Sequence, residues 1–176
     1  TAESLENLSK VQAIVFDKTG TLTENKLSIE GIFCKDKNHT CNIEDTNFKQ
    51  ALIYSMTKSS QHPISASIAG WLKESNTKDF NVSDIKEIPG KGLEAKHDGS
   101  TYYLGSIAYI TEVTGESEKQ IRNDFHDERF ESGRELYLSN DKEVLSLVKI
   151  HDAIKVEAKN EIAKLKKLGL KVIMAT

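Results

Sequence analysis

The stretch Asp17-Lys18-Thr19-Gly20-Thr21-Leu22-Thr23 combines a carboxylate, an amine and several hydroxyl groups at close spacing. It follows the apolar run Ala13-Ile14-Val15-Phe16, which predicts a buried parallel strand. In open α/β folds the carboxyl ends of such strands form the edge of the sheet at which ligands bind. We therefore interpret Asp17 as a candidate nucleophile that the strand delivers to this edge.

The letters of this stretch, DKTGTLT, resemble the phosphorylation motif of the P-type cation-transporting ATPases, and all seven residues of that motif are present. The alternative is a chance match by a strand end and a hydroxyl-rich loop, which seven residues in this context disfavour. The resemblance implies that Asp17 accepts the γ-phosphoryl group of ATP, and that Lys18 and Thr19 support the transfer. It also implies a partial Mg²⁺ site formed by Asp17 and Thr19.

Thr19 bears on a related class, the haloacid-dehalogenase-like phosphatases. That class usually has a second aspartate two residues after the nucleophile, which acts as general acid and base when the phosphoenzyme breaks down. This chain has Thr19 at that position, so an aspartyl-phosphate should persist, as a pump intermediate must. Two alternatives to a pump stay open: a haloacid-dehalogenase-type phosphatase and a non-catalytic module that binds nucleotide.

The composition is that of a globular protein of 176 residues, enough for one large or two small domains. The chain is 38% hydrophobic and 29% charged, and its net charge of −3 gives no electrostatic footprint for nucleic acid. No apolar stretch approaches the length of a membrane span. Because a transport ATPase needs spans, the resemblance implies a soluble region at the cytoplasmic face of a larger membrane protein. Its partners would be ATP, the rest of the pump and a cation held in membrane helices outside this chain.

The pattern after Thr23 changes and predicts a second domain built on an antiparallel sheet. Alternating or β-branched runs predict strands over residues 26–32, 93–97, 101–104, 135–138 and 143–150. Helical periodicity predicts a pair of helices that begin near Asp45 and at Pro63, and a charged surface helix over residues 117–130.

Cys34, His39 and Cys41 lie in or beside a polar segment. Their spacing matches no common zinc signature, so a soft-metal site is disfavoured. We expect two reduced cysteines on a surface loop.

His62 precedes Pro63 at the start of the second helix of the pair. Proline restricts its predecessor to extended conformations, so the imidazole should be presented at the helix entrance, where a histidine is ordinarily a solvated cap. Downstream of DKTGTLT, however, this His-Pro pair is similar to the nucleotide-domain signature of the heavy-metal-transporting P-type ATPases. The resemblance implies that His62 contacts ATP and that the transported ion is copper or zinc/cadmium.

Three further segments bear on the nucleotide site. Gly90 and Gly92 match a Gly-x-Gly that in this subclass lets the backbone approach the nucleotide, although such a pair alone marks only a tight turn. Thr57 stands where the family commonly has a glutamate that accepts a hydrogen bond from the adenine amino group. Ser106 stands where the subclass usually has an asparagine. Both keep a hydroxyl acceptor but lose reach, which predicts weaker nucleotide binding or a site rearranged around other residues.

The end of the chain returns to the first domain. Residues 154–169 predict a helix, with Asp152 as its cap, and residues 170–175 a strand of the same parallel sheet as residues 13–16. The predicted fold class is α/β: an incomplete haloacid-dehalogenase-like parallel sheet (1–24 and 151–176) with an inserted α+β antiparallel-sheet nucleotide-binding domain (25–150). Relatives continue with an acidic Gly-Asp-Gly loop that holds Mg²⁺, so we expect this chain alone to form no stable phosphoenzyme.

Overall fold

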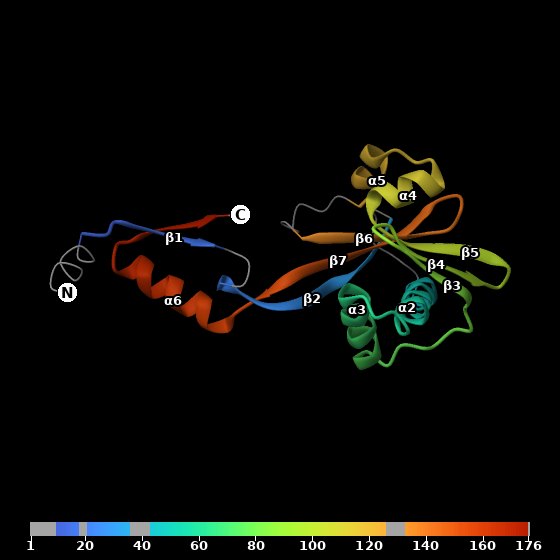
Figure 1. Cartoon of the computed structure of the whole chain (residues 1–176), viewed down its shortest axis with the longest axis horizontal. Coiled ribbons are helices and arrows are strands. Elements are labelled where there is room, and N and C mark those ends of the chain that lie inside the picture. The colour runs from blue at the N-terminus through green and yellow to red at the C-terminus, as the bar shows by residue number, and fades with distance from the viewer. Residues whose placement is uncertain (1–9, 18–20, 36–42, 126–132, 176) are drawn as a thin grey trace. The chain divides into compact units, whose positions relative to one another are not determined.

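The computed structural model describes residues 10–17, 21–35, 43–125 and 133–175. The chain divides into two compact units, one formed by residues 1–27 with 152–176 and the other by residues 28–151. Figure 1 shows the elements of both units, and each unit is described by itself below.

The first unit contains a parallel pair of strands, β1 (Ala13–Asp17) and β8 (Lys171–Ala175), in which Asp17 lies opposite Ala175. Helix α6 (Val156–Lys167) precedes β8 and packs against it. Burial alternates along β1, so Ile14 and Phe16 are half-buried while Asp17 is exposed. The predicted parallel sheet is confirmed, and the carboxyl end of β1 carries Asp17.

The second unit is organised around a sheet with the strand order β2-β7-β6-β5-β4-β3. The strands are β2 (Thr23–Cys34), β3 (Ser83–Ile88), β4 (Gly92–His97), β5 (Ser100–Gly105), β6 (Arg134–Ser139) and β7 (Val144–Ile154). From β3 to β7 each neighbouring pair is antiparallel. The predicted antiparallel sheet is therefore confirmed, with β3 as an edge strand that the sequence pattern did not indicate.

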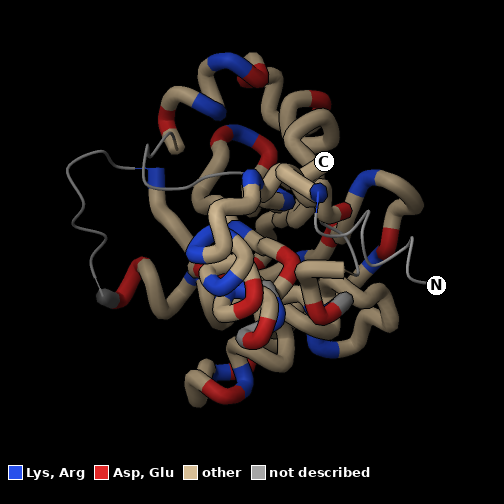
Figure 2. The backbone as a smooth tube through the Cα atoms, turned by 90° about the vertical axis from the view of Figure 1, so that its left-hand side faces the viewer, with Lys and Arg blue, Asp and Glu red and all other residues tan. Residues whose placement is uncertain are grey.

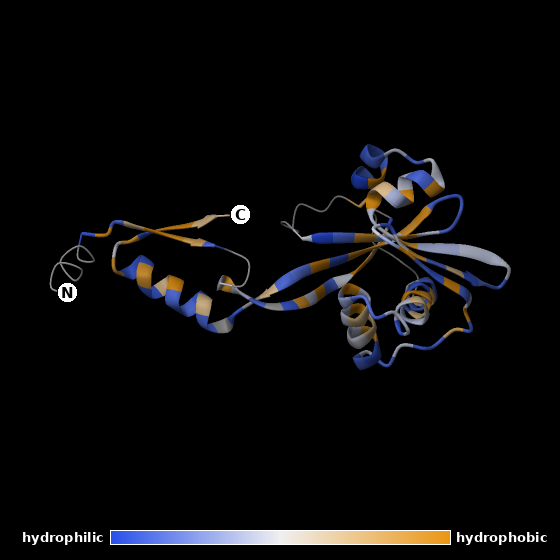
Figure 3. Ribbon diagram, viewed as in Figure 1, coloured by the Kyte–Doolittle hydropathy of each residue, from blue (hydrophilic) through white to orange (hydrophobic). Residues whose placement is uncertain are grey.

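Helices cover both faces of this sheet. Figure 1 shows α2 (Ile43–Thr57) and α3 (Pro63–Glu74) on one face, and α4 (Ile107–Thr114) and α5 (Glu118–Asp124) on the other. Figure 3 shows apolar residues alternating with polar ones along these helices and strands. The core beneath α4 and α5 consists of Tyr109, Ile110, Ile121, Tyr137, Val144 and Leu147.

Burial and a nearby carboxylate change the pKa of one tyrosine of this core, Tyr137. The Tyr137 hydroxyl donates a 2.9 Å hydrogen bond to Glu135. Burial, followed by this carboxylate, raises the pKa of Tyr137 well above its ordinary range, so the phenol stays neutral.

Two helix predictions need correction. Asp152 does not cap α6, because β7 continues to Ile154 and the N-cap residue is Lys155. The charged segment over residues 117–130 forms α5 only from Glu118 to Asp124, and residues 126–130 lie outside the described part of the chain. The paired helices are confirmed, since α3 begins at Pro63 as predicted.

The expectation of a reduced Cys34 is wrong, because Cys34 is disulfide-bonded. A sulfur in a disulfide is not a thiolate ligand, which removes Cys34 from the metal site that was considered. The other residues of that site, His39 and Cys41, lie outside the described residues.

Charge is mixed along the chain. Figure 2 shows Lys and Arg interspersed with Asp and Glu over the described backbone. In this described part, no helix combines the length and the apolar character that crossing a membrane requires.

Candidate functional site

An open pocket of about 460 Å³ lies in the second unit, beside the start of α3 and the turn between β3 and β4. Four residues predicted to bind nucleotide line it: His62, Gly90, Gly92 and Ser106. Apolar side chains contribute much of the rest of the wall, among them Ile64, Leu93, Leu104 and Leu136. An apolar pocket of this size with a few polar groups is typical of small-molecule sites.

His62 is held by the helix that it begins. Its backbone is extended (φ −66°, ψ 131°), as Pro63 requires, and its Nδ1 accepts a 3.2 Å hydrogen bond from the backbone N–H of Ile64. A neutral imidazole that accepts at Nδ1 carries its proton on Nε2. The exposed ring therefore offers the pocket an apolar face and one N–H donor.

A second polar group, which the sequence analysis missed, is the carboxylate of Glu87 on β3. Ser60 Oγ donates a 3.0 Å hydrogen bond to Glu87 Oε2, and it accepts one of 3.2 Å from the backbone N–H of His62. The Ser60 hydroxyl thus joins the carboxylate to the loop that presents His62.

Glycine is needed at positions 90 and 92 for different structural reasons. Gly90 has φ +73°, and a Cβ placed there would meet no atom within 4 Å. Gly92 has φ +152°, and its Cβ would lie 2.1 Å from the carbonyl oxygen of Leu104. The fold itself therefore requires glycine at 92, whereas at 90 only the backbone conformation favours it.

Ser106 and Lys91 lie next to this turn. The backbone N–H of Ser106 donates to the carbonyl of Lys91 at 3.0 Å, and Ser106 Oγ accepts from Tyr109 N at 3.4 Å as the cap of α4. Lys91 Nζ contacts both carboxylate oxygens of Glu112, at 2.6 and 2.8 Å. The pocket thus has a cation at its rim, in an exposed ion pair that a ligand can exchange at little cost.

Thr57 does not lie at the pocket. Its side chain is fully buried in α2, and its hydroxyl donates a 2.7 Å hydrogen bond to the carbonyl of Ile53. The structure brings together the other four predicted nucleotide residues and leaves Thr57 in the helix interior.

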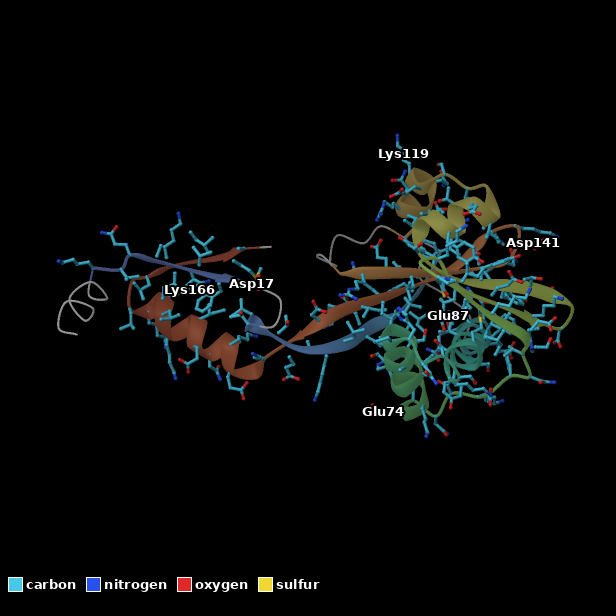
Figure 4. All side chains as sticks on the ribbon, viewed as in Figure 1. Asp17, Glu74, Glu87, Lys119, Asp141 and Lys166 are labelled. Carbon is cyan, nitrogen blue, oxygen red and sulfur yellow. The ribbon has the colours of Figure 1, made fainter. Side chains whose placement is uncertain are left out.

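Asp17 lies in the first unit, exposed at the carboxyl end of β1, and is labelled in Figure 4. Lys18 and Thr19 lie outside the described residues. The motif beyond them is fixed to the start of α6, since the backbone N–H of Lys155 donates to Leu22 O at 2.9 Å and Lys155 Nζ to Thr21 O at 3.0 Å.

Asp17 is the residue of the predicted Mg²⁺ site that lies in the described part of the chain. Its carboxylate has the hard oxygen atoms that Mg²⁺ prefers. Among the residues that the structure covers, however, no group of three or more His, Cys, Asp or Glu side chains is placed to hold a metal ion. The described residues do not by themselves make a magnesium site.

The chain is similar to a known protein family and to several known proteins. A family model described as a hydrolase, haloacid dehalogenase-like hydrolase, matches residues 11–176. The chain is 31% identical over 180 residues to the "Copper-exporting P-type ATPase B" of Archaeoglobus fulgidus, and 30% identical over 178 residues to a "Probable cadmium-transporting ATPase" of Alkalihalophilus pseudofirmus. These alignments cover 99% and 98% of this chain but 24% of each relative. The chain therefore spans about a quarter of the length of these relatives.

Solved structures share the fold. A zinc-transporting PIB-type ATPase in its E2.Pi state matches 97% of this chain and 26% of its own, with a TM-score of 0.71 and 20% identity. The catalytic domain of the CPx-ATPase CopB-B matches 99% of this chain and 57% of its own, with a TM-score of 0.62 and 23% identity.

Proposed function

The chain belongs to the haloacid dehalogenase-like hydrolase family, and from this premise we propose that it is the ATP-binding and phosphorylation region of a P-type ATPase. In that role it couples ATP hydrolysis, through an aspartyl-phosphate, to the movement of a heavy-metal cation across a membrane. The names of the relatives, which are copper and cadmium ATPases, support this class of ion. The region would face the cytoplasm, and the cation would bind in membrane helices of the same pump.

The observation that carries the proposal is the pocket in the second unit. Three separate segments of the sequence, which contribute His62, Gly90 with Gly92, and Ser106, line one pocket whose size suits a nucleotide. The His62 ring supplies a stacking surface and a donor for the base. The turn at Gly90 lets the backbone approach the ligand without a Cβ in between.

The chemistry that we propose takes place at Asp17. A carboxylate oxygen of Asp17 forms a bond to the γ-phosphorus of ATP, the bond from that phosphorus to the β–γ bridging oxygen breaks, and ADP leaves. Lys18 and Thr19 would neutralise and orient the transferred group. Threonine at position 19 supplies no carboxylate for general acid–base hydrolysis, which disfavours the phosphatase alternative.

Replacing His62 tests nucleotide binding. His62→Ala should raise the dissociation constant for ATP about tenfold, because the base loses a stacking surface and a hydrogen bond. His62→Asn is the sharper variant, since asparagine can still cap α3 but has no ring. Isothermal titration calorimetry with ATP measures both.

Gln61→Ala is the matched control, because Gln61 is exposed and is not among the residues that line the pocket. It should leave ATP affinity unchanged. Wild-type affinity in the His62→Asn variant would remove the main support for this nucleotide site.

A further inference from the structure

Glu87 is the acidic side chain of the pocket, and the sheet register explains how it comes to lie there. It stands directly opposite Leu93 on β4, and Leu93 stands opposite Leu104 on β5. Residues directly opposite one another project from the same face of a sheet. Since Leu93 and Leu104 both line the pocket, Glu87 reaches it from the exposed edge of that face; Figure 4 labels its position.

The Ser60 hydroxyl orients this carboxylate. It donates a hydrogen bond to Oε2, and among the described residues no other side-chain hydrogen bond of Glu87 is found. Oε1 is therefore left to accept a hydrogen bond from a ligand. The same hydroxyl accepts from the backbone of His62, so the acceptor of Glu87 and the donor of His62 are held by one network.

We propose that Glu87 selects adenine by accepting a hydrogen bond from the exocyclic amino group of the base. The inference rests on the proposed function, because it names the base that the same pocket recognises. It also gives this chain a carboxylate for that contact although Thr57, at the position expected from sequence, is buried in α2.

The charge of Glu87 decides which part of a nucleotide it contacts. The phosphate groups of ATP are acceptors and anions, so a carboxylate repels them and cannot receive a hydrogen bond from them. The base provides N–H donors. Lys91 also lines the pocket, and its positive charge suits it to bind the phosphate groups.

The engagement of Oε2 favours adenine over guanine. Guanine presents two adjacent donors, its ring N–H and its 2-amino group, which a carboxylate binds with both oxygens. In Glu87 the oxygen Oε2 already accepts from Ser60 Oγ, so a contact through both oxygens would have to share Oε2 with that hydroxyl. The 6-amino group of adenine needs only one acceptor oxygen, and guanine has a carbonyl at that position.

The test uses ATP, purine riboside triphosphate, which is ATP without the 6-amino group, and GTP. Wild-type protein should bind ATP about tenfold more tightly than either of the others. Glu87→Gln should weaken ATP binding about fivefold to tenfold, since a neutral amide oxygen is a poorer acceptor than a carboxylate. Binding of purine riboside triphosphate should be unchanged or slightly tighter, because a negative charge is removed. Calorimetric titration gives all the constants.

Asp84→Asn is the matched control, since it removes one negative charge from the same strand at a residue that is not among those lining the pocket. ATP affinity should stay at the wild-type value. This comparison separates the acceptor role of Glu87 from a general effect of charge on β3.

Four outcomes overturn the inference. If Glu87→Gln weakens ATP and purine riboside triphosphate equally, Glu87 only positions the His62 loop through Ser60. If Glu87→Gln binds ATP and purine riboside triphosphate more tightly by the same factor, Glu87 is only a repulsive charge at the rim of the pocket. If the wild-type protein binds no nucleotide, or binds it independently of His62, the proposed function fails as well. ATP binding that depends on His62, with the preference for ATP intact in Glu87→Gln, would overturn the role of Glu87 alone.

Discussion

The Gly92→Ala variant is expected to destabilise the unit of residues 28–151 by on the order of 3 kcal/mol or more. A Cβ at this position would lie 2.1 Å from Leu104 O and 2.6 Å from the Cα of Gly105, and both are backbone atoms that a rotamer change cannot move. The φ of +152° adds conformational strain for any residue with a side chain. Domains are typically stable by only about 5–15 kcal/mol, so a substantial fraction of the stability should be lost. Urea denaturation followed by the fluorescence of Trp71, the single tryptophan, measures it in this unit.

Gly90→Ala is the control for this prediction. Its φ of +73° also favours glycine, but its Cβ would meet no atom, so the expected loss is only about 1–2 kcal/mol. Equal losses in the two variants would mean that the turn moves away from β5 and relieves the contact at Gly92.

Local signals predicted the elements that position the site. The apolar run before Asp17 was sufficient to predict the parallel strand β1, although its residues alternate between exposed and half-buried instead of being buried as expected. Pro63 fixed both the start of α3 and the extended backbone of His62, since its ring restricts its own φ and the conformation of the preceding residue. In each case one or two neighbouring residues determine the outcome.

Strand β3 escaped prediction because its burial pattern is that of an edge. Five of its six residues are exposed, and the segment Ser-Asp-Ile-Lys-Glu-Ile has no apolar alternation. Edge strands are commonly polar, which protects them from pairing with other chains. Glu87 was missed for the same reason, and its approach to Ser60 depends on contacts between distant segments that no local pattern encodes.

Thr57 shows the limit of inference from a matched position. The prediction of this helix rested on helical periodicity, which is typical of a helix buried along one side. In the structure the last turns of α2 are buried nearly all round, including Ile53, Met56 and Thr57. The Thr57 hydroxyl therefore donates its hydrogen bond to the helix backbone, at Ile53 O. A residue that matches a family ligand contact in sequence need not face the ligand in the structure.

Replacing Asp17 with asparagine should abolish the phosphoenzyme in the full-length protein. An amide is not a nucleophile toward phosphorus, and loss of a nucleophile commonly costs about 10³-fold or more in rate. Asp17 is exposed at the end of β1, so the substitution should leave folding intact. Acid-stable label from γ-labelled ATP measures the intermediate, which should be detected in the wild type and fall below detection in the variant.

Glu157→Gln serves as the control, because Glu157 is an exposed carboxylate of the same unit, in the first turn of α6. It should retain the label. ATP binding by Asp17→Asn should also be retained, since the nucleotide pocket is formed by residues of the other unit. Loss of label with intact ATP binding would assign the defect to the chemical step. Persistence of the label would mean that another residue accepts the phosphoryl group, and the motif would then lose its proposed role.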